Sequence, residues 1–533
     1  MSDVDGFPED LLVGLTPEQR DAVTSTERQI LVRATAGSGK THVLTLRIQR
    51  RVALGEHAPG AVLALTFTRK AADELRRRLA RGSIRDVRAG TFHRAALTLL
   101  NERRADEGRP PVVIEPSRRR LVTQVSEALA SSGVHIDDWQ IPRLEVEVGW
   151  ALSQGLTGSA YLAQARRHRR DSPLRPAQFA ELLDRYVGLC RARGVVDFDL
   201  LLSEAIALLR DVPAVRASVR HRTRAIYVDE AQDMNPLQFA LLREIGGPDP
   251  DLFAVGDANQ SIYGFNGANP ALLQDLVSTW PRTVVIDLTR NHRSTAPIVT
   301  IASTLLDPGA RGITPALEEG PLPVVRSYET DAEEATNVVR WITLHHHPGA
   351  AWRDLAVLAR TNAQLDPVAQ ALEAAGVPYE RRGPEHAPAS DLVGAAPGRH
   401  DPPASPDAVA LSTIHRAKGL EFAGVAVIGW AEGQLPHYAA VTPEQLAEER
   451  RLAYVALSRA EAHLLITWSR GRDDPRFPDR EPSRFLAPVH EALARLQRSA
   501  APVTGEALHR RLAALRKQLG ASSDPGPGDT VAP

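Results

Sequence analysis

A short glycine-containing run near the start of the chain constrains its fold more than any other feature. Residues 34–41 read Ala-Thr-Ala-Gly-Ser-Gly-Lys-Thr, which fits the phosphate-binding P-loop pattern with alanine in the first glycine position. An apolar stretch at 30–32 precedes the run, and a helical pattern of apolar residues at 43–48 follows it. Strand, loop and helix therefore fall in the order that a P-loop requires. The sequence predicts an α/β protein built around a nucleotide-binding loop.

The chemistry of this loop names the first candidate site residues. Lysine is scarce in this arginine-rich chain, and Lys40 supplies the compact point charge that suits the β- and γ-phosphates. Thr41 is the expected Mg²⁺ ligand. The backbone N–H groups expected to cradle the phosphates belong to Ala34, Thr35, Ala36, Gly37, Ser38 and Gly39. We therefore expect ATP and Mg²⁺ to bind here.

Two carboxylates complete the expected nucleotide site. The apolar run at 225–228 ends in Asp229 and Glu230. In a P-loop enzyme, Asp229 would hold Mg²⁺ through water, and Glu230 would orient and deprotonate the attacking water. An isolated Asp-Glu pair is more simply an exposed acidic turn after a strand. The P-loop upstream favours the catalytic interpretation.

Length and charge limit what surrounds this site. At 533 residues and 43% hydrophobic, the chain can form about two to four domains. A formal net charge of −1 excludes a uniformly basic surface, so any contact with DNA or RNA must be local. Cys190 is the one cysteine, which excludes disulfide frameworks and cysteine-ligated clusters. The lack of a long apolar run and the acidic start lead us to expect a cytoplasmic protein without membrane contact.

Further runs follow in a fixed order along the chain. They are LTPEQ at 15–19, LTFTRKAA at 65–72, GTFH at 90–93, DEAQD at 229–233, VGDANQSIYGF at 255–265, NHRS at 291–294, TIHRAKGLEF at 413–422 and ERRLAYVALSRA at 449–460. This ordered set resembles the motifs of the UvrD/Rep family of superfamily 1 DNA helicases over residues 11–490. One such run can arise by chance, but the ordered set is highly specific.

The resemblance extends the nucleotide site to the adenosine. Gln19 would read the adenine edge with an amide that both donates and accepts, although alone it is an ordinary helix-start residue. Glu421 would accept from a ribose hydroxyl. His292 stands where the family usually has a tyrosine that stacks on adenine. This difference bears on how tightly the nucleotide is held.

The resemblance also supplies groups for the γ-phosphate. Gln260, after the apolar run at 252–255, would face the γ-phosphate, and a plain turn amide is the alternative. Arg293 and Arg459 resemble the paired arginine fingers of the second motor core, a role worth about 10³ to 10⁵ in rate. Taken singly, each arginine is equally consistent with a surface salt bridge.

Scarce aromatic residues, 5% of the chain, indicate a track for single-stranded nucleic acid. Phe67, Phe92, Tyr263 and Phe265 follow expected strands, where a base-stacking platform is worth about 1–3 kcal/mol per base. Interior packing is the alternative for the first two. The candidate DNA contacts beside them are Thr66, Thr68, Arg69, Lys70, Thr91, His93 and His415. Asn266 replaces an arginine that the family has beside the stacking aromatic.

The chain divides into two RecA-like P-loop NTPase cores, parallel sheets flanked by helices, with a helical insertion in the first. We expect the first core (1A) at 1–95 and 200–285 and its insertion (1B) at 96–199. The second core (2A) is expected at 286–383 and 408–492. Only a Pro/Ala/Gly-rich linker, 384–407, stands where the family usually has a large 2B insertion, and 493–533 reads as a helix and disordered tail.

The implied function is an ATP-dependent DNA helicase or translocase that moves 3′ to 5′ on single-stranded DNA in repair or replication. Expected partners are single-stranded DNA, single/double-strand junctions, and repair or recombination proteins. Two alternatives stay open. One is an ATP-driven translocase that displaces proteins without separating strands, and the other is the motor subunit of a helicase-nuclease complex. No candidate nuclease cluster follows Arg459, so the latter would need a partner.

Overall fold

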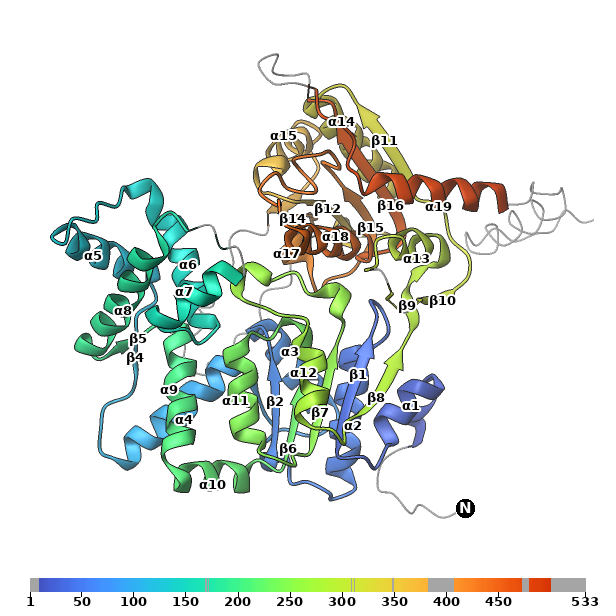
Figure 1. Cartoon of the computed structure of the whole chain (residues 1–533). Helices are drawn as coiled ribbons and strands as arrows, with labels where there is room; N and C mark the ends of the chain where they lie inside the picture. The colour runs from blue at the N-terminus through green and yellow to red at the C-terminus, as the bar shows by residue number, and fades with distance from the viewer. Residues whose placement is uncertain are drawn as a thin grey trace, which may run out of the picture.

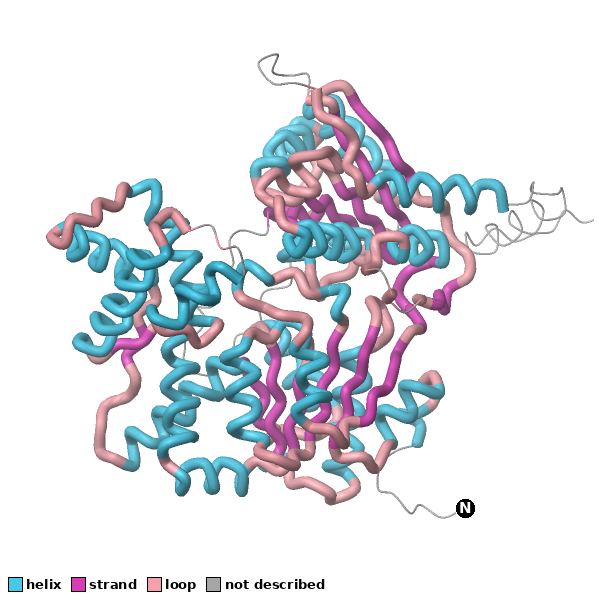
Figure 2. The backbone as a smooth tube through the Cα atoms, in the orientation of Figure 1, coloured by secondary structure: helices cyan, strands magenta, loops and turns pink. Residues whose placement is uncertain are grey.

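The computed structural model of the chain describes residues 9–167, 170, 172–307, 309–310, 312–347, 349–381, 407–471 and 479–499. Two six-stranded parallel sheets lie one above the other, and a group of helices stands beside the lower sheet (Figure 1). Helices flank both sheets, which confirms the predicted α/β class (Figure 2). Within the described ranges, no helix combines the length and the apolar character needed to cross a bilayer.

The first sheet has the strand order β3-β2-β6-β7-β1-β8. Its strands are β1 (Gln29–Ala34), β2 (Val62–Thr66), β3 (Arg88–Thr91), β6 (Ala225–Val228), β7 (Leu252–Gly256) and β8 (Val284–Leu288). Ile30 and Val32 pack into one hydrophobic cluster and Leu31 into another, on opposite faces of the sheet. Because both faces are buried, β1 reads as a continuous apolar run in the sequence.

The helices associated with the first sheet follow the strands in chain order. They are α1 (Pro17–Thr24), α2 (Lys40–Ala53), α3 (Arg69–Arg81), α4 (Phe92–Asp106), α9 (Phe198–Asp211), α10 (Pro213–Arg222), α11 (Pro236–Gly246) and α12 (Leu272–Thr279). Two 3₁₀ turns, η4 (Ala231–Asp233) and η5 (Ala258–Gln260), follow β6 and β7 and shape the site described below.

A helical group with its own hydrophobic cluster lies between α4 and α9. It contains α5 (Arg118–Ala130), α6 (Ile141–Ser153), α7 (Gly158–Arg167) and α8 (Pro176–Arg193). A short parallel pair that was not predicted, β4 (Val113–Ile114) with β5 (Val195–Val196), joins its two ends. Arg118 donates to both Asp197 and Asp199 beside this pair, at 3.0 and 2.6 Å.

The second sheet has the order β11-β16-β15-β12-β14-β13. Its strands are β11 (Val324–Tyr328), β12 (Leu355–Ala359), β13 (Tyr379–Arg381), β14 (Val409–Thr413), β15 (Phe422–Val427) and β16 (Ala460–Ser469). Its helices are α13 (Ala296–Ser303), α14 (Asp331–His345), α15 (Asp366–Ala374), α17 (Ile414–Ala417), α18 (Pro443–Leu457) and α19 (Leu486–Ser499). Residues 384–406 and 500–533, with most of the expected linker and tail, lie outside the described residues.

The two cores are joined by β9 (Arg290–Thr295), which pairs with β10 (Thr314–Leu317) outside both sheets. Ala36 of the P-loop and Ile262 after β7 are buried in the hydrophobic cluster of the second core. The loops at the carboxyl ends of β1 and β7 therefore form part of the contact between the cores. Side chains of the second core can reach the P-loop directly.

Candidate nucleotide and single-strand sites

The phosphate-binding loop lies between β1 and α2, and its glycines occupy positions that other residues fill poorly. Gly37 and Gly39 have φ of 69° and 81°, in the left-handed region that favours glycine. A Cβ on Gly37 would also lie 2.8 Å from the Asn291 amide of the second core. Since α2 begins at Lys40, its free N–H groups and positive dipole end face the loop. The segment is shaped to hold an anion.

Lys40 points a buried ammonium into this site. Its Nζ has no hydrogen-bond partner among the described residues, and it lies 3.9 Å from Glu230 Oε2. A buried polar group without a hydrogen bond is costly, and a phosphate oxygen would satisfy it. This ammonium without a hydrogen bond therefore fits the phosphates of ATP.

Thr41 and Asp229, the expected metal ligands, lie together. Thr41 Oγ1 donates to Asp229 Oδ2 at 3.0 Å. Burial, together with the charge of Glu230, raises the pKa of Asp229 to about 6. A divalent cation would relieve that unfavourable charge, and hydroxyl and carboxylate oxygens are ligands that Mg²⁺ prefers. These two residues fit Mg²⁺.

Glu230 is held in a strained backbone conformation beside the loop. Its φ of 52° lies in the left-handed region, which costs a non-glycine residue about 1–3 kcal/mol. Gln232, which was not predicted although it lies in the DEAQD run, donates Nε2 to Glu230 Oε2 at 2.5 Å. Burial opposes ionisation, but Lys40 and Lys418 outweigh it and hold the pKa of Glu230 at about 2. Glu230 is therefore an ionised carboxylate in a fixed position.

The second core contacts the P-loop through β9 and α18. Asn291 Nδ2 donates to the Ala36 carbonyl at 2.8 Å, and the His292 N–H donates to the Gly37 carbonyl at 2.9 Å. The Tyr454 hydroxyl accepts from the Ala36 N–H at 3.4 Å. Asn291 and Tyr454 were not predicted, although they lie in the NHRS and ERRLAYVALSRA runs. The His292 side chain is exposed beside this contact.

The two predicted arginine fingers have different surroundings. Arg459 is 1% exposed, and its Nη2 lies 3.5 Å from Gln260 Oε1, so it reaches the amide expected at the γ-phosphate. Burial and the nearby Arg293 lower the pKa of Arg459 to about 9. Arg293 Nε and Nη2 lie 2.8 and 2.7 Å from Glu421 Oε2. Arg293 and Glu421 thus form an ion pair with each other. Their expected contacts with ATP require that this ion pair break when ATP binds.

Gln19 fastens α1 to the P-loop. Its Oε1 accepts from the Thr16 N–H at 3.0 Å as part of a capping box, and its Nε2 donates to the Ser38 carbonyl at 2.9 Å. The side chain is buried. Its second amide N–H is what remains for the expected contact with adenine.

The predicted stacking aromatics are not equally open. Phe265 is 49% exposed, and its ring centroid lies 5.5 Å from that of His415 in the second core. Tyr263 stacks on Phe67 at 5.1 Å and donates its hydroxyl to the His415 carbonyl at 3.1 Å. We expected Tyr263 to be exposed, but contacts from both cores leave it half-buried. Among these aromatic residues, Phe265 is the one whose ring is exposed for stacking.

Two residues that we expected to contact DNA are buried in the structure. Phe92 is 2% exposed within the first-core cluster, so the expectation that it stacks on a base is wrong, because apolar side chains enclose its ring. Thr66 is 1% exposed, and its Oγ1 donates to the Thr68 carbonyl at 3.0 Å. Its hydroxyl is therefore not available to a phosphate.

The other expected phosphate contacts gather at two helix N-termini. Thr68 and Thr91 cap α3 and α4, each accepting at 3.2 Å from a backbone N–H of the first turn. Arg69 and Lys70 are the first residues of α3, and Lys70 is exposed. Burial lowers the pKa of His93 to about 4 and that of His415 to about 3, so both rings are neutral near pH 7. Helix N-termini with adjacent cations suit backbone phosphates.

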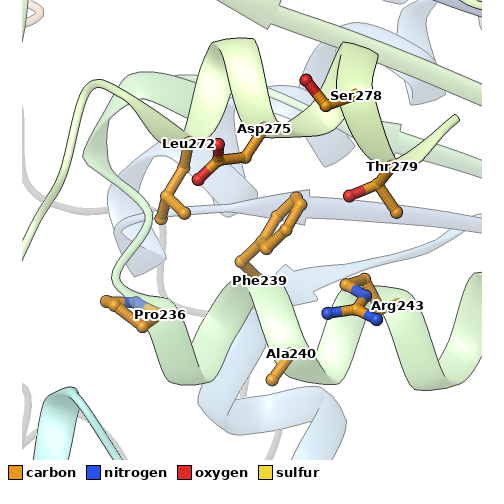
Figure 3. Close-up of a pocket in the computed structure, with 8 residues that line it drawn as sticks. All are labelled: Pro236, Phe239, Ala240, Arg243, Leu272, Asp275, Ser278 and Thr279. Atoms are coloured by element: carbon orange, nitrogen blue, oxygen red, sulfur yellow. The ribbon is translucent and has the colours of Figure 1, made fainter. Parts of the chain in front are cut away.

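A hollow of about 410 Å³ lies elsewhere on the first core, between α11 and α12 (Figure 3). Phe239 lies in the middle of the view, with Arg243 and Asp275 on either side. None of the expected nucleotide or DNA residues lines it. The hollow is therefore separate from the site described above.

The fold and the site define a two-core P-loop NTPase in which Asn291, His292 and Tyr454 of the second core contact the P-loop of the first. The sequence matches the family descriptions "UvrD/REP helicase N-terminal domain" at residues 15–281 and "UvrD-like helicase C-terminal domain" at 286–385 and 399–471. The chain belongs to the UvrD/Rep helicase family.

Known members of this family align with different shares of the chain. The "ATP-dependent DNA helicase UvrD2" of Mycobacterium tuberculosis (strain ATCC 25618 / H37Rv) is 32% identical, across 96% of this chain and 85% of the relative. The "Putative ATP-dependent DNA helicase YjcD" of Bacillus subtilis (strain 168) is 32% identical, across 69% of this chain and 48% of the relative. "DNA helicase II" of Salmonella typhimurium is 31% identical, across 70% and 52%.

Proposed function

We propose that the protein is an ATP-dependent DNA helicase or translocase that moves 3′ to 5′ on single-stranded DNA in repair or replication. One observation carries the proposal. The buried ammonium of Lys40 lies 3.9 Å from the ionised carboxylate of Glu230 without a hydrogen-bond partner among the described residues, and Arg459 reaches across from the second core to Gln260. Membership of the UvrD/Rep family and the names of its helicase relatives support the choice of DNA as the track.

The residues of the cleft have complementary tasks in ATP hydrolysis. The loop N–H groups and Lys40 bind the phosphates, and Thr41 with Asp229 would hold Mg²⁺, which neutralises the charge that develops on the phosphoryl group. Glu230 orients the attacking water and accepts its proton. Arg459 stabilises the transferring group from the second core.

ATP binding must exchange two ion pairs. Lys40 has to turn from Glu230 toward phosphate, and Arg293 has to leave Glu421. The second exchange would link a nucleotide bound to the first core to Arg293 of the second core. Closure of the two cores on ATP and their release after hydrolysis follow from these exchanges.

The single-strand track lies on the same contact between cores. Phe265, from the first core, and His415, from the second, lie side by side, so relative movement of the cores changes the space at the open ring. Stacking on such a ring is insensitive to base identity, as a translocase requires. Repeated closure would move the cores along the strand.

The 384–407 segment leads us to propose a short form without the 2B insertion. The family match to the second half breaks between 385 and 399, within this segment. We expect the monomer to translocate on single strands and to separate short duplexes unless a partner assists.

The test combines two measurements on the whole chain. We expect single-stranded DNA to stimulate ATP hydrolysis by the parental chain, and we expect the chain to separate a 3′-tailed duplex. The Lys40→Ala variant should show neither stimulated hydrolysis nor strand separation. Stimulated hydrolysis and displacement of a strand-bound protein without duplex separation would favour the protein-displacing translocase. Absence of DNA stimulation would refute the proposal.

A further inference from the structure

Lys418 is a buried cation at the boundary between the cores, and the mechanism above gives it no task beyond its effect on the pKa of Glu230. It follows α17 directly, and its side chain is 6% exposed. Figure 1 shows α17 on the side of the second core that faces the first. Arginine is the usual basic residue of this chain. A compact ammonium with three donors suits contact with several partners in a confined space better than a planar guanidinium does.

Three partners surround the Lys418 ammonium, and all belong to the first core. Asp233 Oδ2 and the Gln260 carbonyl each lie 2.5 Å from Nζ. The ring centroid of Tyr263 lies 5.0 Å away, within the range of a cation–π contact. One side chain thus touches the catalytic-carboxylate segment, the γ-phosphate segment and the single-strand track.

The contact with Asp233 leads to the catalytic carboxylate in one step. The Asp233 N–H donates to the Glu230 carbonyl at 2.9 Å and closes the 3₁₀ turn η4. Asp233 is 2% exposed, and its Oδ1 has no hydrogen-bond partner among the described residues, so Lys418 is the one ion-pair partner recorded for it there. A shift of the ammonium therefore moves η4, and η4 carries the strained backbone of Glu230.

The contact with Tyr263 leads to the track. Tyr263 stacks on Phe67 and donates to the His415 carbonyl, while Phe265 lies against the His415 ring. His415 belongs to α17, which ends one residue before Lys418. A strand that displaces Phe265 or His415 therefore displaces the segment that holds Lys418.

We infer that Lys418 is a positioning residue that couples occupancy of the single-strand track to the position of Glu230. The inference rests on the proposed function and adds to it the route by which DNA stimulates hydrolysis. The recorded partners of Lys418 are Asp233, the Gln260 carbonyl and the Tyr263 ring, so it acts on the reaction through other residues. It sets the turn from which Glu230 acts, and it responds to the side chains that a strand contacts.

Thermodynamic linkage gives a test independent of turnover. A strand and a non-hydrolysable ATP analogue that share one coupling must change each other's binding affinity by the same factor, commonly about 5- to 150-fold. We would measure the Kd of a labelled oligo(dT) with and without saturating analogue and Mg²⁺. Lys418→Met should reduce the ratio of the two Kd values to within about twofold of unity. The DNA stimulation of kcat should fall in parallel.

A double variant guards against misfolding. Lys418→Met leaves Asp233 buried without its cation, whereas Lys418→Met with Asp233→Asn removes both charges, a change that buried pairs often tolerate. The double variant should lose the coupling to the same extent as the single variant. Non-additivity of this kind is expected when two residues act as a unit.

Arg451→Met is the matched control. Arg451 also crosses from the second core, donating Nε to the Ser261 carbonyl at 2.8 Å, but no recorded contact joins it to Asp233 or Tyr263. It should keep the coupling. Equal loss of coupling in Arg451→Met would overturn the inference, as would parental coupling in the Lys418 variants or a more than tenfold loss of their analogue-free DNA affinity. If the parental chain shows neither coupling nor DNA stimulation, the proposed function itself fails.

Discussion

Replacing Glu230 with glutamine separates its chemical role from its structural one. A glutamine keeps an acceptor for Gln232 Nε2 and the same backbone, so the fold of the site should persist. The ion pair with Lys40 that is lost is long, at 3.9 Å, and we expect phosphate to replace it in any case. A positioned general base contributes about 10²–10⁴ in rate, which corresponds to about 3–5 kcal/mol of transition-state stabilisation. We therefore expect kcat to fall by that factor.

The assay is steady-state ATP hydrolysis at saturating single-stranded DNA, together with the Kd of a fluorescent ATP analogue. The Kd should stay the same or tighten, because one negative charge near the phosphates is removed. Glu181→Gln is the control, since Glu181 is exposed on α8 and pairs only with Arg185 among the recorded ion pairs. A kcat of Glu230→Gln within tenfold of the parental value would show that another group activates the water.

Three further outcomes follow from other parts of the structure. Phe265→Ala should weaken oligo(dT) binding by about 1–3 kcal/mol in a fluorescence titration and leave ATP-analogue binding unchanged, because the exposed ring is the open stacking surface. Burial raises the pKa of Glu334 from 4.5 to about 7 in the folded chain. The contribution of Glu334 to the free energy of unfolding is therefore fully present below pH 4.5 and is lost as the pH rises through about 7. Glu334→Gln should therefore have a Tm several degrees above the parental one at about pH 8 but not at pH 4.5, which scanning calorimetry checks. Arg118→Met should destabilise the chain by about 3–5 kcal/mol, since Asp197 and Asp199 stay buried, and adding Asp197→Asn with Asp199→Asn should restore most of the Tm.

Local sequence patterns predicted the scaffold of the nucleotide site well. The strands β1, β6 and β7 lie in the apolar runs that predicted them, because a sheet buried on both faces needs continuous apolar residues. The P-loop was also predictable from local sequence. Its backbone has positive φ at Gly37 and Gly39, and this local conformation favours glycine. Thr41 and Asp229, which are far apart in the chain, are hydrogen-bonded in the structure.

The expectations that failed depend on what packs over a residue. Phe92 begins α4 and follows a strand, as a stacking residue would, yet the helices of the first core enclose it. The position of Tyr263 between Phe67 and the second core has no local signal either. The partnership of Arg293 with Glu421 joins residues 128 positions apart, which motif order alone does not pair. Burial and long-range pairing belong to the tertiary structure.

The segment after β7 shows why nucleotide and strand need no long relay between them. Gln260 bonds Asp257 and approaches Arg459 through its side chain, while its carbonyl accepts from Lys418. Three residues later, Tyr263 contacts that same ammonium. One stretch of nine residues, 257–265, therefore carries both Gln260, which we expect at the γ-phosphate, and the exposed Phe265. Because its middle, Ile262, is buried among second-core residues, the two ends cannot respond to the second core independently. The route that we propose through Lys418 is therefore short, because its contacts with the Gln260 carbonyl and with the Tyr263 ring lie three residues apart in this segment.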